Sequence, residues 1–273
     1  MRYSVLMAVC QKDDPNDLAI SLRSIYEEQS RKPDEIVVVF DGPLTDEQTK
    51  VLDAFIKGKE EVVRYCPQAE NRGLGEALRV GTACCTGDYI FRMDADDISL
   101  PNRFERQIEY SEAHPEIDVL GTDIAEFTVD AENGKKRIKA CPARHEDIVQ
   151  MGKRRNPMNH VTVCIKREAL LRCGGYETLL LVEDYYLWLK MIAAGCKFAN
   201  INEPLVLVRL GHEFYAKRGS KLHIKGWKVL QAYMVEQGMI KKSQARMNMM
   251  YIRLFIYSPS WLKKIYYKKL RKG

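Results

Sequence analysis

The first part of the chain alternates short apolar runs with stretches that carry a helical pattern. Each apolar run is bounded by turn residues and rich in β-branched or aromatic side chains, which is typical of buried strands. The stretches between them repeat apolar residues every three or four positions, as at Leu18, Leu22 and Ile25, which is typical of amphipathic helices. This alternation predicts an α/β domain with a mostly parallel central sheet flanked by helices. The expected strands are Tyr3–Val9, Glu35–Phe40, Val62–Tyr65 and Tyr89–Met93, and the expected helices are Leu18–Gln29, about Thr45–Lys57 and Gly75–Ala83.

The remainder of the chain is less regular. The expected elements there are strands at Asp118–Val129, His160–Ile165 and Pro204–Leu210, a turn at Asn133-Gly134, a loop or short helix over Ile148–Arg155, and a helix over Asp184–Ala194. From Lys221 the pattern becomes helical and basic. Because no repeat or low-complexity linker interrupts the chain, we expect a domain over residues 1–216 and a helical extension over residues 217–273.

Composition narrows the class of protein. Hydrophobic residues make up 46% of the sequence and charged residues 29%, which is ordinary for a globular protein. No apolar run approaches the roughly 20 residues that span a bilayer, and the apolar start is too short for a signal peptide. We therefore expect a cytoplasmic protein. The eight cysteines show no CxxC pair or Cys/His ligand spacing, so reduced thiols are expected rather than disulfides or a zinc site.

The positive charge is concentrated at the C-terminal end. Residues 217–273 contain 15 Lys and Arg and one acid, Glu236, so the remainder of the chain is net acidic although the whole chain carries +6. A basic segment on an acidic body suggests an anionic partner such as a membrane, nucleic acid or a phosphorylated substrate. A solvated charged helix explains the same count.

The sharpest local motif is FRMDADD, Phe91–Asp97. Two carboxylates one residue apart at a strand end, Asp94 and Asp96, can converge on one hard divalent cation that bridges diphosphate oxygens. The alternative is that Asp96 and Asp97 only lead into the next helix, with Pro101 near its first turn. The preceding strand favours the metal site, because ligands of α/β sheets bind beyond the carboxyl ends of the strands.

Asp41 also follows a predicted strand. A carboxylate there can accept the N3–H of a uracil or thymine ring and so select a pyrimidine nucleotide. Its alternative role is that of a turn residue before Gly42-Pro43.

Glu183-Asp184 begins a predicted helix. A carboxylate at a helix start can simply cap the positive end of the helix dipole. It can also act as a general base that takes a proton from an attacking hydroxyl.

Other polar residues carry weaker signals. Asn71-Arg72-Gly73 can direct backbone N–H groups or Arg72 toward phosphate, or form a plain loop. His160 fits a histidine satisfied beside a strand, and His212 fits either a metal ligand or a surface residue. Further cations that can reach a diphosphate, or remain solvated, are Arg209, Lys217 and Arg218.

Taken together, the motifs resemble the family 2 glycosyltransferases of the GT-A fold. The first half of that pattern reads SVLMAVC, VVVFDG, Asn71-Arg72-Gly73, Gly87-Asp88-Tyr89-Ile90, Asp94-Ala95-Asp96-Asp97 and Pro101. The second half reads Gly174-Gly175-Tyr176, Glu183-Asp184-Tyr185, Leu187-Trp188-Leu189, Glu203-Pro204-Leu205 and Arg209. Order and spacing are kept from residue 3 to about residue 212. One departure is Phe40, which replaces the first aspartate of the family's VDD segment.

The resemblance implies a role for each matching residue. Backbone at Ala8, Val9 and Cys10, together with the Asp41 carboxylate, would hold the nucleobase, with Asn71 and Arg72 near the donor. Asp94 would contact the ribose or the metal's water, and Asp96 would ligate Mg²⁺ or Mn²⁺, with His212 as a further candidate ligand. Asp184 would be the general base, and Glu183 would position the acceptor. The implied reaction is a single inverting displacement on a nucleotide-sugar, with a UDP-sugar expected as the donor.

The C-terminal segment resembles the bacterial amylovoran-type subgroup, which builds exopolysaccharide, capsule or O-antigen repeats. Within YSPSWLKKIYYKKLRK, Trp261, Leu262, Ile265 and Tyr266 recur at helical spacing among lysines and arginines. A basic amphipathic segment with aromatic residues suits an anionic membrane surface, where a lipid-linked glycan acceptor would lie. We therefore expect a peripheral protein on the inner face of the cell membrane. The alternative is a helix that packs on the body with its lysines in water.

Three other classes fit less well. A sugar-1-phosphate nucleotidyltransferase would carry a Gly-rich basic loop after its first strand, where this chain has Gln11-Lys12-Asp13-Asp14-Pro15. A non-catalytic binder of nucleotide-sugar or polysaccharide would not need all of the carboxylates present here. Nucleic-acid binding lacks a recognisable motif, so no nucleic-acid partner is expected.

Overall fold

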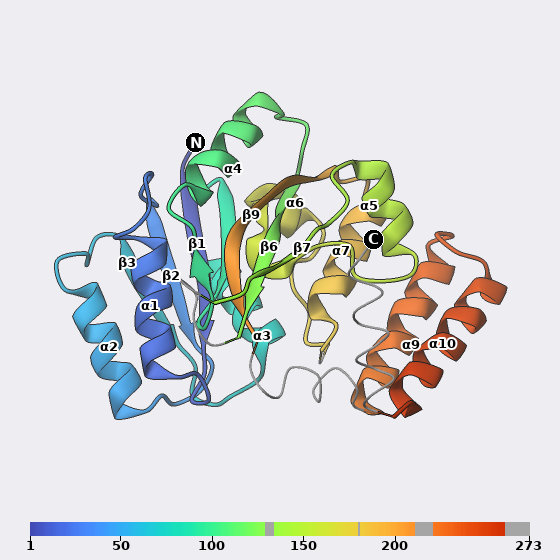
Figure 1. Cartoon of the computed structure of the whole chain (residues 1–273), viewed down its shortest axis with the longest axis horizontal. Helices are drawn as coiled ribbons and strands as arrows, with labels where there is room; N and C mark the ends of the chain where they lie inside the picture. Colours follow the sequence, from blue (N-terminus) through green and yellow to red (C-terminus); the bar gives the residue numbers. More distant parts are fainter. Residues whose placement is uncertain (129–133, 180, 211–220, 260–273) are drawn as a thin grey trace.

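The computed structural model describes residues 1–128, 134–179, 181–210 and 221–259. A nine-stranded sheet runs through the centre in the order β3-β2-β1-β4-β8-β6-β9-β5, with β7 paired to β6 (Figure 1). The first four strands of this order are parallel, as predicted from the sequence. They are β1 (Tyr3–Val9), β2 (Glu35–Phe40), β3 (Val63–Pro67) and β4 (Tyr89–Asp94).

The helices between these strands begin where local capping signals are strong. In α1 (Pro15–Ile25), Asp14 accepts the N–H groups of Asn16 and Asp17, and proline occupies the first turn. The predicted range Leu18–Gln29 began too late because it followed the apolar spacing and ignored these signals, and it ended too late, since the C-cap is Tyr26. In α2 (Asp46–Ile56), Thr45 and Gln48 form a capping box. The third helix is α3 (Leu74–Cys84).

The second half of the sheet contains both parallel and antiparallel pairs, and its longest pairing is parallel, so the predicted α/β sheet flanked by helices is confirmed. Strand β8 (Cys164–Lys166) is antiparallel to both β4 and β6 (Val119–Phe127), whereas β6 and β9 (Phe198–Arg209) are parallel. The short strand β5 (Ile98–Ser99) pairs antiparallel with β9, and the short strand β7 (Arg137–Lys139) pairs antiparallel with β6.

Two other predicted strands differ from the structure. The range His160–Ile165 was predicted as one strand, but His160–Thr162 is a 3-10 turn, η1, and only the residues after it join β8. The range Pro204–Leu210 is the second part of β9, whose pairing with β6 is interrupted near Asp123. The apolar pattern was lost across this irregularity, which hid the first part of the strand. The predicted turn at Asn133-Gly134 falls partly outside the described residues.

The remaining helices surround this half of the sheet. They are α4 (Arg103–Ala113), α5 (His145–Gly152), α6 (Arg167–Arg172), α7 (Glu183–Ala193), α9 (Lys221–Glu236) and α10 (Lys242–Tyr257). The segment predicted as a loop or short helix is therefore α5.

Alternate residues of the central strands enter two separate cores. Val5 and Met7 belong to one buried cluster, and Leu6, between them, belongs to the other. Because successive side chains of a strand point to opposite faces, both faces of the sheet are buried under helices.

The C-terminal helices pack on the body through α7. Leu189 of α7 and Leu230 and Met234 of α9 belong to one buried apolar cluster, and Asn248 of α10 donates to the Lys153 carbonyl at 3.0 Å. In Figure 1, α9 and α10 lie side by side at one end of the molecule. Among the described residues, no helix is both long and apolar enough to cross a membrane.

Candidate active site

The ends of three neighbouring strands bring the predicted donor-site residues together. Ala8 of β1 is paired with Asp94 of β4, and the Asp41 N–H donates to the Val9 carbonyl at 2.8 Å. Ser21 of α1 donates its hydroxyl to the Asp94 carbonyl at 2.8 Å, which fixes the end of β4. The parallel half of the sheet therefore gathers these residues at its carboxyl edge, as expected for a ligand site.

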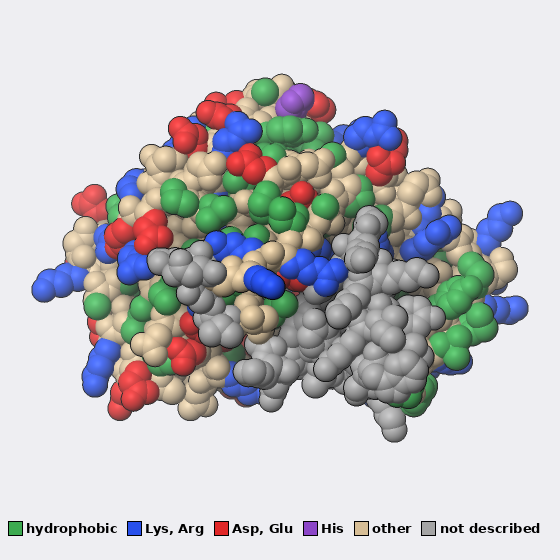
Figure 2. All heavy atoms as spheres, viewed as in Figure 1, with side chains coloured by type: hydrophobic (Ala, Val, Ile, Leu, Met, Phe, Trp, Pro, Cys, Tyr) green, Lys and Arg blue, Asp and Glu red, His purple; other side chains and the backbone are tan. Residues whose placement is uncertain are grey.

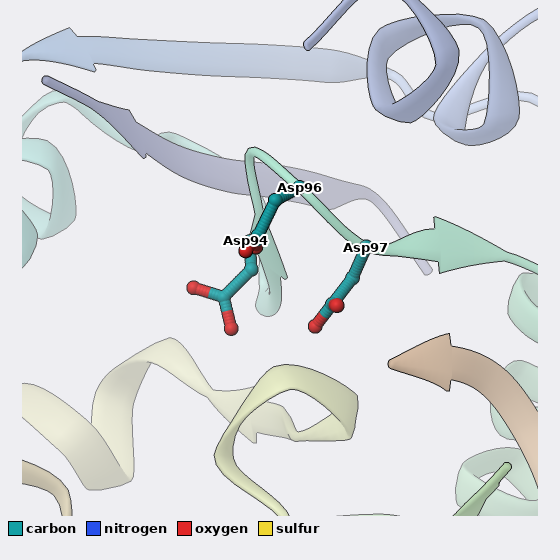
Figure 3. Close-up of side chains that lie close together, drawn as sticks. All are labelled: Asp94, Asp96 and Asp97. Atoms are coloured by element: carbon teal, nitrogen blue, oxygen red, sulfur yellow. The ribbon is translucent and has the colours of Figure 1, made fainter. Parts of the chain in front are cut away.

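Three aspartates form a cluster at this edge. Asp94 ends β4, and Asp96 and Asp97 lie in the loop to β5 (Figure 3). Their carboxylate oxygens lie within 4.8 Å of one another. Because hard divalent cations prefer oxygen ligands, this donor set fits Mg²⁺ or Mn²⁺. Asp97 was not predicted as a candidate ligand, although it is the next acid in the motif.

The electrostatics of the cluster also fit a cation. Burial and the neighbouring Asp94 carboxylate raise the pKa of Asp96 to about 6, and the same two causes raise the pKa of Asp97 well above its usual value. The buried Arg92 guanidinium contacts Asp94 and supplies a positive charge on one side. A bound divalent cation would offset the remaining repulsion among the carboxylates.

Arg209, the last residue of β9, holds the loop that carries the aspartates. Its backbone N–H donates to Asp97 Oδ1 at 2.8 Å, and its Nε donates to the Asp96 carbonyl at 3.2 Å. Its Nη2 pairs with Asp17 Oδ1 at 2.7 Å, and its guanidinium lies 4.8 Å from the centre of the Phe127 ring. The sequence suggested Arg209 as a diphosphate contact, and the structure shows it engaged with the loop.

The predicted base, Asp184, lies in the first turn of α7. Asn156, in the segment after α5, donates its Nδ2 to Asp184 Oδ2 at 2.5 Å, and the Tyr185 N–H donates to Asp184 Oδ1 at 2.6 Å. The N-cap residue of α7 is Val182, which makes no side-chain cap. Asp184 is therefore not the N-cap of this helix, and one of its oxygens is held from another segment.

Glu183 differs from its neighbour in environment. Its Oε2 is buried without a hydrogen-bond partner, and its Cβ lies 3.3 Å from the position of a Cβ built on Gly75 of α3. Burial, and then the charge of Asp184, raise its pKa to about 7. Glu183 is absent from the residues that line the cleft described next, whereas Asp184 is one of them.

One cleft of about 2070 Å³ connects the aspartate cluster with Asp184. It runs from the end of β4 past α5 and α7 to α10 and is large enough for a nucleotide-sugar and an acceptor. Its polar lining includes Asp94, Asp96, Asn156, Asp184 and Arg209. The structure therefore brings two predicted metal ligands, Asp94 and Asp96, and the predicted base to one site.

The other predicted donor residues lie beside the cleft and do not line it. Asp41 is buried, and its carboxylate accepts the N–H groups of Arg72, at 2.7 Å, and Gly73, at 3.0 Å. The Asn71 side chain donates to the Asp41 carbonyl at 3.1 Å. Asp41 thus holds the 71–73 loop at the start of α3, and its role as a nucleobase contact stays a prediction.

Close packing beside Asp41 depends on Gly42. It has φ +86°, and a Cβ built there would lie 2.6 Å from the backbone nitrogen of Asn71.

Two other predicted donor residues make local contacts. The Cys10 N–H donates to Asp13 Oδ2 at 2.7 Å, and the Cys10 carbonyl accepts from Gln48 at 2.9 Å. Arg72 is exposed and pairs with Glu70 at 2.7 Å.

Of the two histidines considered from the sequence, the structure describes His160. The His160 Nε2 lies 2.9 Å from the Tyr176 hydroxyl, and burial holds the pKa of His160 well below its usual value. It is a satisfied histidine, as the sequence suggested. His212, Lys217 and Arg218 lie outside the described residues, so their predicted roles stay predictions.

Two residues of the site, Arg92 and Asn156, were not predicted from the sequence. Arg92 and Asp94 are two positions apart on β4, so strand alternation places them on one face, and this signal was available. Asn156 had no comparable signal, because Asn156-Pro157 is typical of a turn and its contact with Asp184 links distant segments.

Comparison with known proteins identifies the family. Residues 4–180 match the family described as Glycosyl transferase family 2. Amylovoran biosynthesis glycosyltransferase AmsE of Erwinia amylovora is 36% identical over 230 residues, which cover 84% of this chain and 82% of that protein. The UDP-Gal:alpha-D-GlcNAc-diphosphoundecaprenol beta-1,3-galactosyltransferase of Escherichia coli is 36% identical over 218 residues, which cover 80% of this chain and 78% of that protein.

A solved structure supports the same fold. Mannosyltransferase PcManGT from Pyrobaculum calidifontis, in complex with GDP-Man and Mn2+, aligns with a TM-score of 0.63 at 16% identity, over 95% of this chain and 70% of that one. This likeness confirms the predicted GT-A α/β fold. The family match and the identity to AmsE and the galactosyltransferase confirm the resemblance seen in the motifs: this chain belongs to the family 2 glycosyltransferases.

Proposed function

We propose that this glycosyltransferase transfers a hexose, with inversion, from a UDP-sugar to a hydroxyl of a lipid-linked glycan during the assembly of a bacterial surface polysaccharide. The observation that carries the proposal is the single cleft that contains both the aspartate cluster and Asp184. The names of the two relatives support the donor, the diphosphate-linked lipid acceptor and the polysaccharide product.

The donor end of the site is the carboxyl edge of β1, β2 and β4. The nucleobase would lie against Ala8, Val9 and Cys10 near Asp41, with the 71–73 loop beside it. Asp94 and Asp96, with Asp97 beside them, would hold Mg²⁺ or Mn²⁺. When bound, the ion supplies positive charge to the diphosphate leaving group. Arg92 and Arg209 keep the carboxylates oriented for that purpose, through the contacts described above.

The acceptor end is Asp184. Its carboxylate would accept the proton of the acceptor hydroxyl while that oxygen forms a bond to the anomeric carbon. The bond from that carbon to the diphosphate oxygen breaks in the same step, and the nucleoside diphosphate leaves with the electron pair. Attack from the face opposite the leaving group inverts the anomeric configuration. Asn156 would hold the carboxylate in place.

The location follows from the acceptor. A glycan attached to lipid diphosphate is presented at the inner face of the cell membrane, so we place this protein in the cytoplasm and peripherally on that face. The domain boundary near residue 217 and the membrane contact of the basic extension are part of this proposal. Their support is the basic composition of residues 217–273.

A hydrolysis and transfer screen tests the proposal. Purified protein is incubated with UDP-, dTDP- and GDP-sugars, with and without Mn²⁺, and with a sugar-diphosphate-alkyl acceptor. The expected result is Mn²⁺-dependent release of UDP and a product of inverted configuration by NMR. Release of GDP alone would overturn the choice of donor, and a retained configuration would overturn the single displacement.

A further inference from the structure

One side of α10 exposes large hydrophobic residues. Leu254 and Tyr257 keep 62% and 65% of their surface exposed, and the whole exposed set is Met247, Met250, Tyr251, Leu254 and Tyr257. Each of these positions has another of the set three or four residues away, so together they form one continuous face along the helix. We name these five residues the α10 stripe. In Figure 2, hydrophobic side chains gather over α10 at the right edge of the molecule, beside Lys and Arg side chains.

The stripe does not serve the packing of α10 onto the protein. The opposite side of the helix already does so, because Ile256 is buried and Asn248 is bonded to Lys153 and Gln231. The helix therefore has apolar residues on its exposed side as well as on its buried side. An exposed apolar face of this kind marks a surface that binds a membrane or another protein.

The charges beside the stripe indicate which environment that is. The sequence of α10 contains no acidic residue, and Arg246 and Arg253 are exposed on one flank of the stripe. An antiparallel contact between two copies of α10 would bring these arginines of one copy close to those of the other, which is unfavourable. An anionic lipid surface accepts both the apolar side chains and the arginines.

The stripe is continuous with the cleft. Tyr251, Leu254 and Tyr257 belong to the stripe and also line the cleft that contains Asp184. Lys153 and Arg154, at the end of α5, line the same cleft on the side where α10 is anchored. A molecule that extends from a bilayer in contact with the stripe would therefore enter the cleft beside α10. The same cleft contains Asp184.

We propose that the α10 stripe is a membrane-docking surface that seats the protein on an anionic bilayer, with the acceptor side of the cleft at the lipid surface. The docking itself stands on the exposure and charge of α10. Only the identity of the lipid-linked molecule that enters the cleft rests on the proposed function.

Vesicle sedimentation of the full chain tests the proposal. The probes are vesicles of phosphatidylcholine with one quarter phosphatidylglycerol, and vesicles of phosphatidylcholine alone. The test variant is Met247→Gln with Met250→Gln, two stripe residues that do not line the cleft. The matched control is Leu171→Gln with Val229→Gln, which removes exposed apolar side chains from α6 and α9. Because all four residues are exposed, both variants should melt within about 2 °C of wild type.

The expected result is that the stripe variant partitions about tenfold less into the anionic vesicles while the control variant binds as wild type. Arg246→Glu should weaken binding to the anionic vesicles and leave the weak binding to neutral vesicles unchanged. Mn²⁺-dependent hydrolysis of UDP-sugar without vesicles is measured in parallel, so that a failure of the proposed function is recognised separately.

Two outcomes overturn the proposal. One is equal vesicle binding by the stripe variant and the control variant. The other is a wild-type dimer in sedimentation velocity that the stripe variant converts to a monomer without any change in vesicle binding, because the stripe would then be an interface between two copies.

Discussion

Asn156 donates a hydrogen bond from Nδ2 to Oδ2 of Asp184 at 2.5 Å, and this contact joins the segment after α5 to the first turn of α7. A general base must be held at a fixed position relative to the hydroxyl that it deprotonates. Asn156 is suited to hold Asp184 because its amide N–H donates to one carboxylate oxygen without transferring a proton to it.

Asn156→Ala should therefore lower kcat by about 10- to 100-fold with little change in the KM for donor, because the donor binds at the other end of the cleft. Steady-state kinetics with varied donor and varied acceptor check this. Asn156→Gln, which retains the amide, should recover part of the rate. Equal loss in the Ala and Gln variants, with a lowered melting temperature, would indicate a structural role instead.

Arg209 connects the aspartate loop with α1. Arg209→Ala removes the contacts to the Asp96 carbonyl and the Asp17 carboxylate but keeps the backbone N–H that donates to Asp97. We expect Mn²⁺ affinity to fall about tenfold, because the loop loses two of its anchors. Titration followed by the electron paramagnetic resonance of free Mn²⁺ measures this. An unchanged affinity would show that the backbone bond alone positions the loop.

Protons should compete with metal at the aspartate cluster. The pKa of Asp96 is raised to about 6, so at pH 5.5 this carboxyl is mostly protonated and at pH 8 it is ionised. Because a cation binds the ionised form, the affinity for Mn²⁺ should rise by about fourfold between these pH values. Asp96→Asn should bind more weakly at both and with a smaller pH dependence. Equal Mn²⁺ affinity of the wild type at both values would contradict the assignment.

The buried Glu183 should lower stability as pH rises. Its pKa is raised from the ordinary 4.5 to about 7, so the folded state binds the proton more tightly than the unfolded state. The stability that this group contributes is thus present in full below about pH 4.5 and is lost as pH rises to about 7. Glu183→Gln should be more stable than wild type by about 2 kcal/mol at pH 8, and the difference should shrink at pH 5.5.

Urea unfolding at the two pH values measures that difference. Asp147→Asn, at an exposed acid of α5, is a suitable control and should shift stability equally at both. A constant difference between Glu183→Gln and wild type would show that Glu183 is ionised in the folded protein at both pH values.

The sequence predicted the parallel half of the sheet well because its signals are local. Strands β1, β2 and β4 are mostly apolar runs between turn residues, and both Asp41 and Asp94 lie at strand ends. The mixed half was predicted poorly because its pairing is set by contacts between distant segments. Nothing near Cys164 indicates that β8 would pair antiparallel with both β4 and β6.

The site shows the same division. Motifs predicted Asp94, Asp96 and Asp184 as candidate site residues, and the structure places all three in one cleft, whereas most of their partners were not predicted. Arg209 contacts Asp17, and Asn156 contacts Asp184, across distances in sequence that no periodicity reports. Asp41 was predicted to follow a strand, and it does. The hydrogen bonds that its carboxylate accepts from the backbone N–H groups of Arg72 and Gly73 could not be predicted from the sequence.

The central claim is that Asp184 removes the acceptor proton in a cleft whose other end binds the donor. Single-turnover transfer by Asp184→Asn, with UDP binding measured by calorimetry, tests it most directly. The expected result is a loss of transfer of at least about 1,000-fold, with UDP affinity in the presence of Mn²⁺ within about twofold of wild type. Transfer at the wild-type rate by this variant would show that Asp184 is not the base.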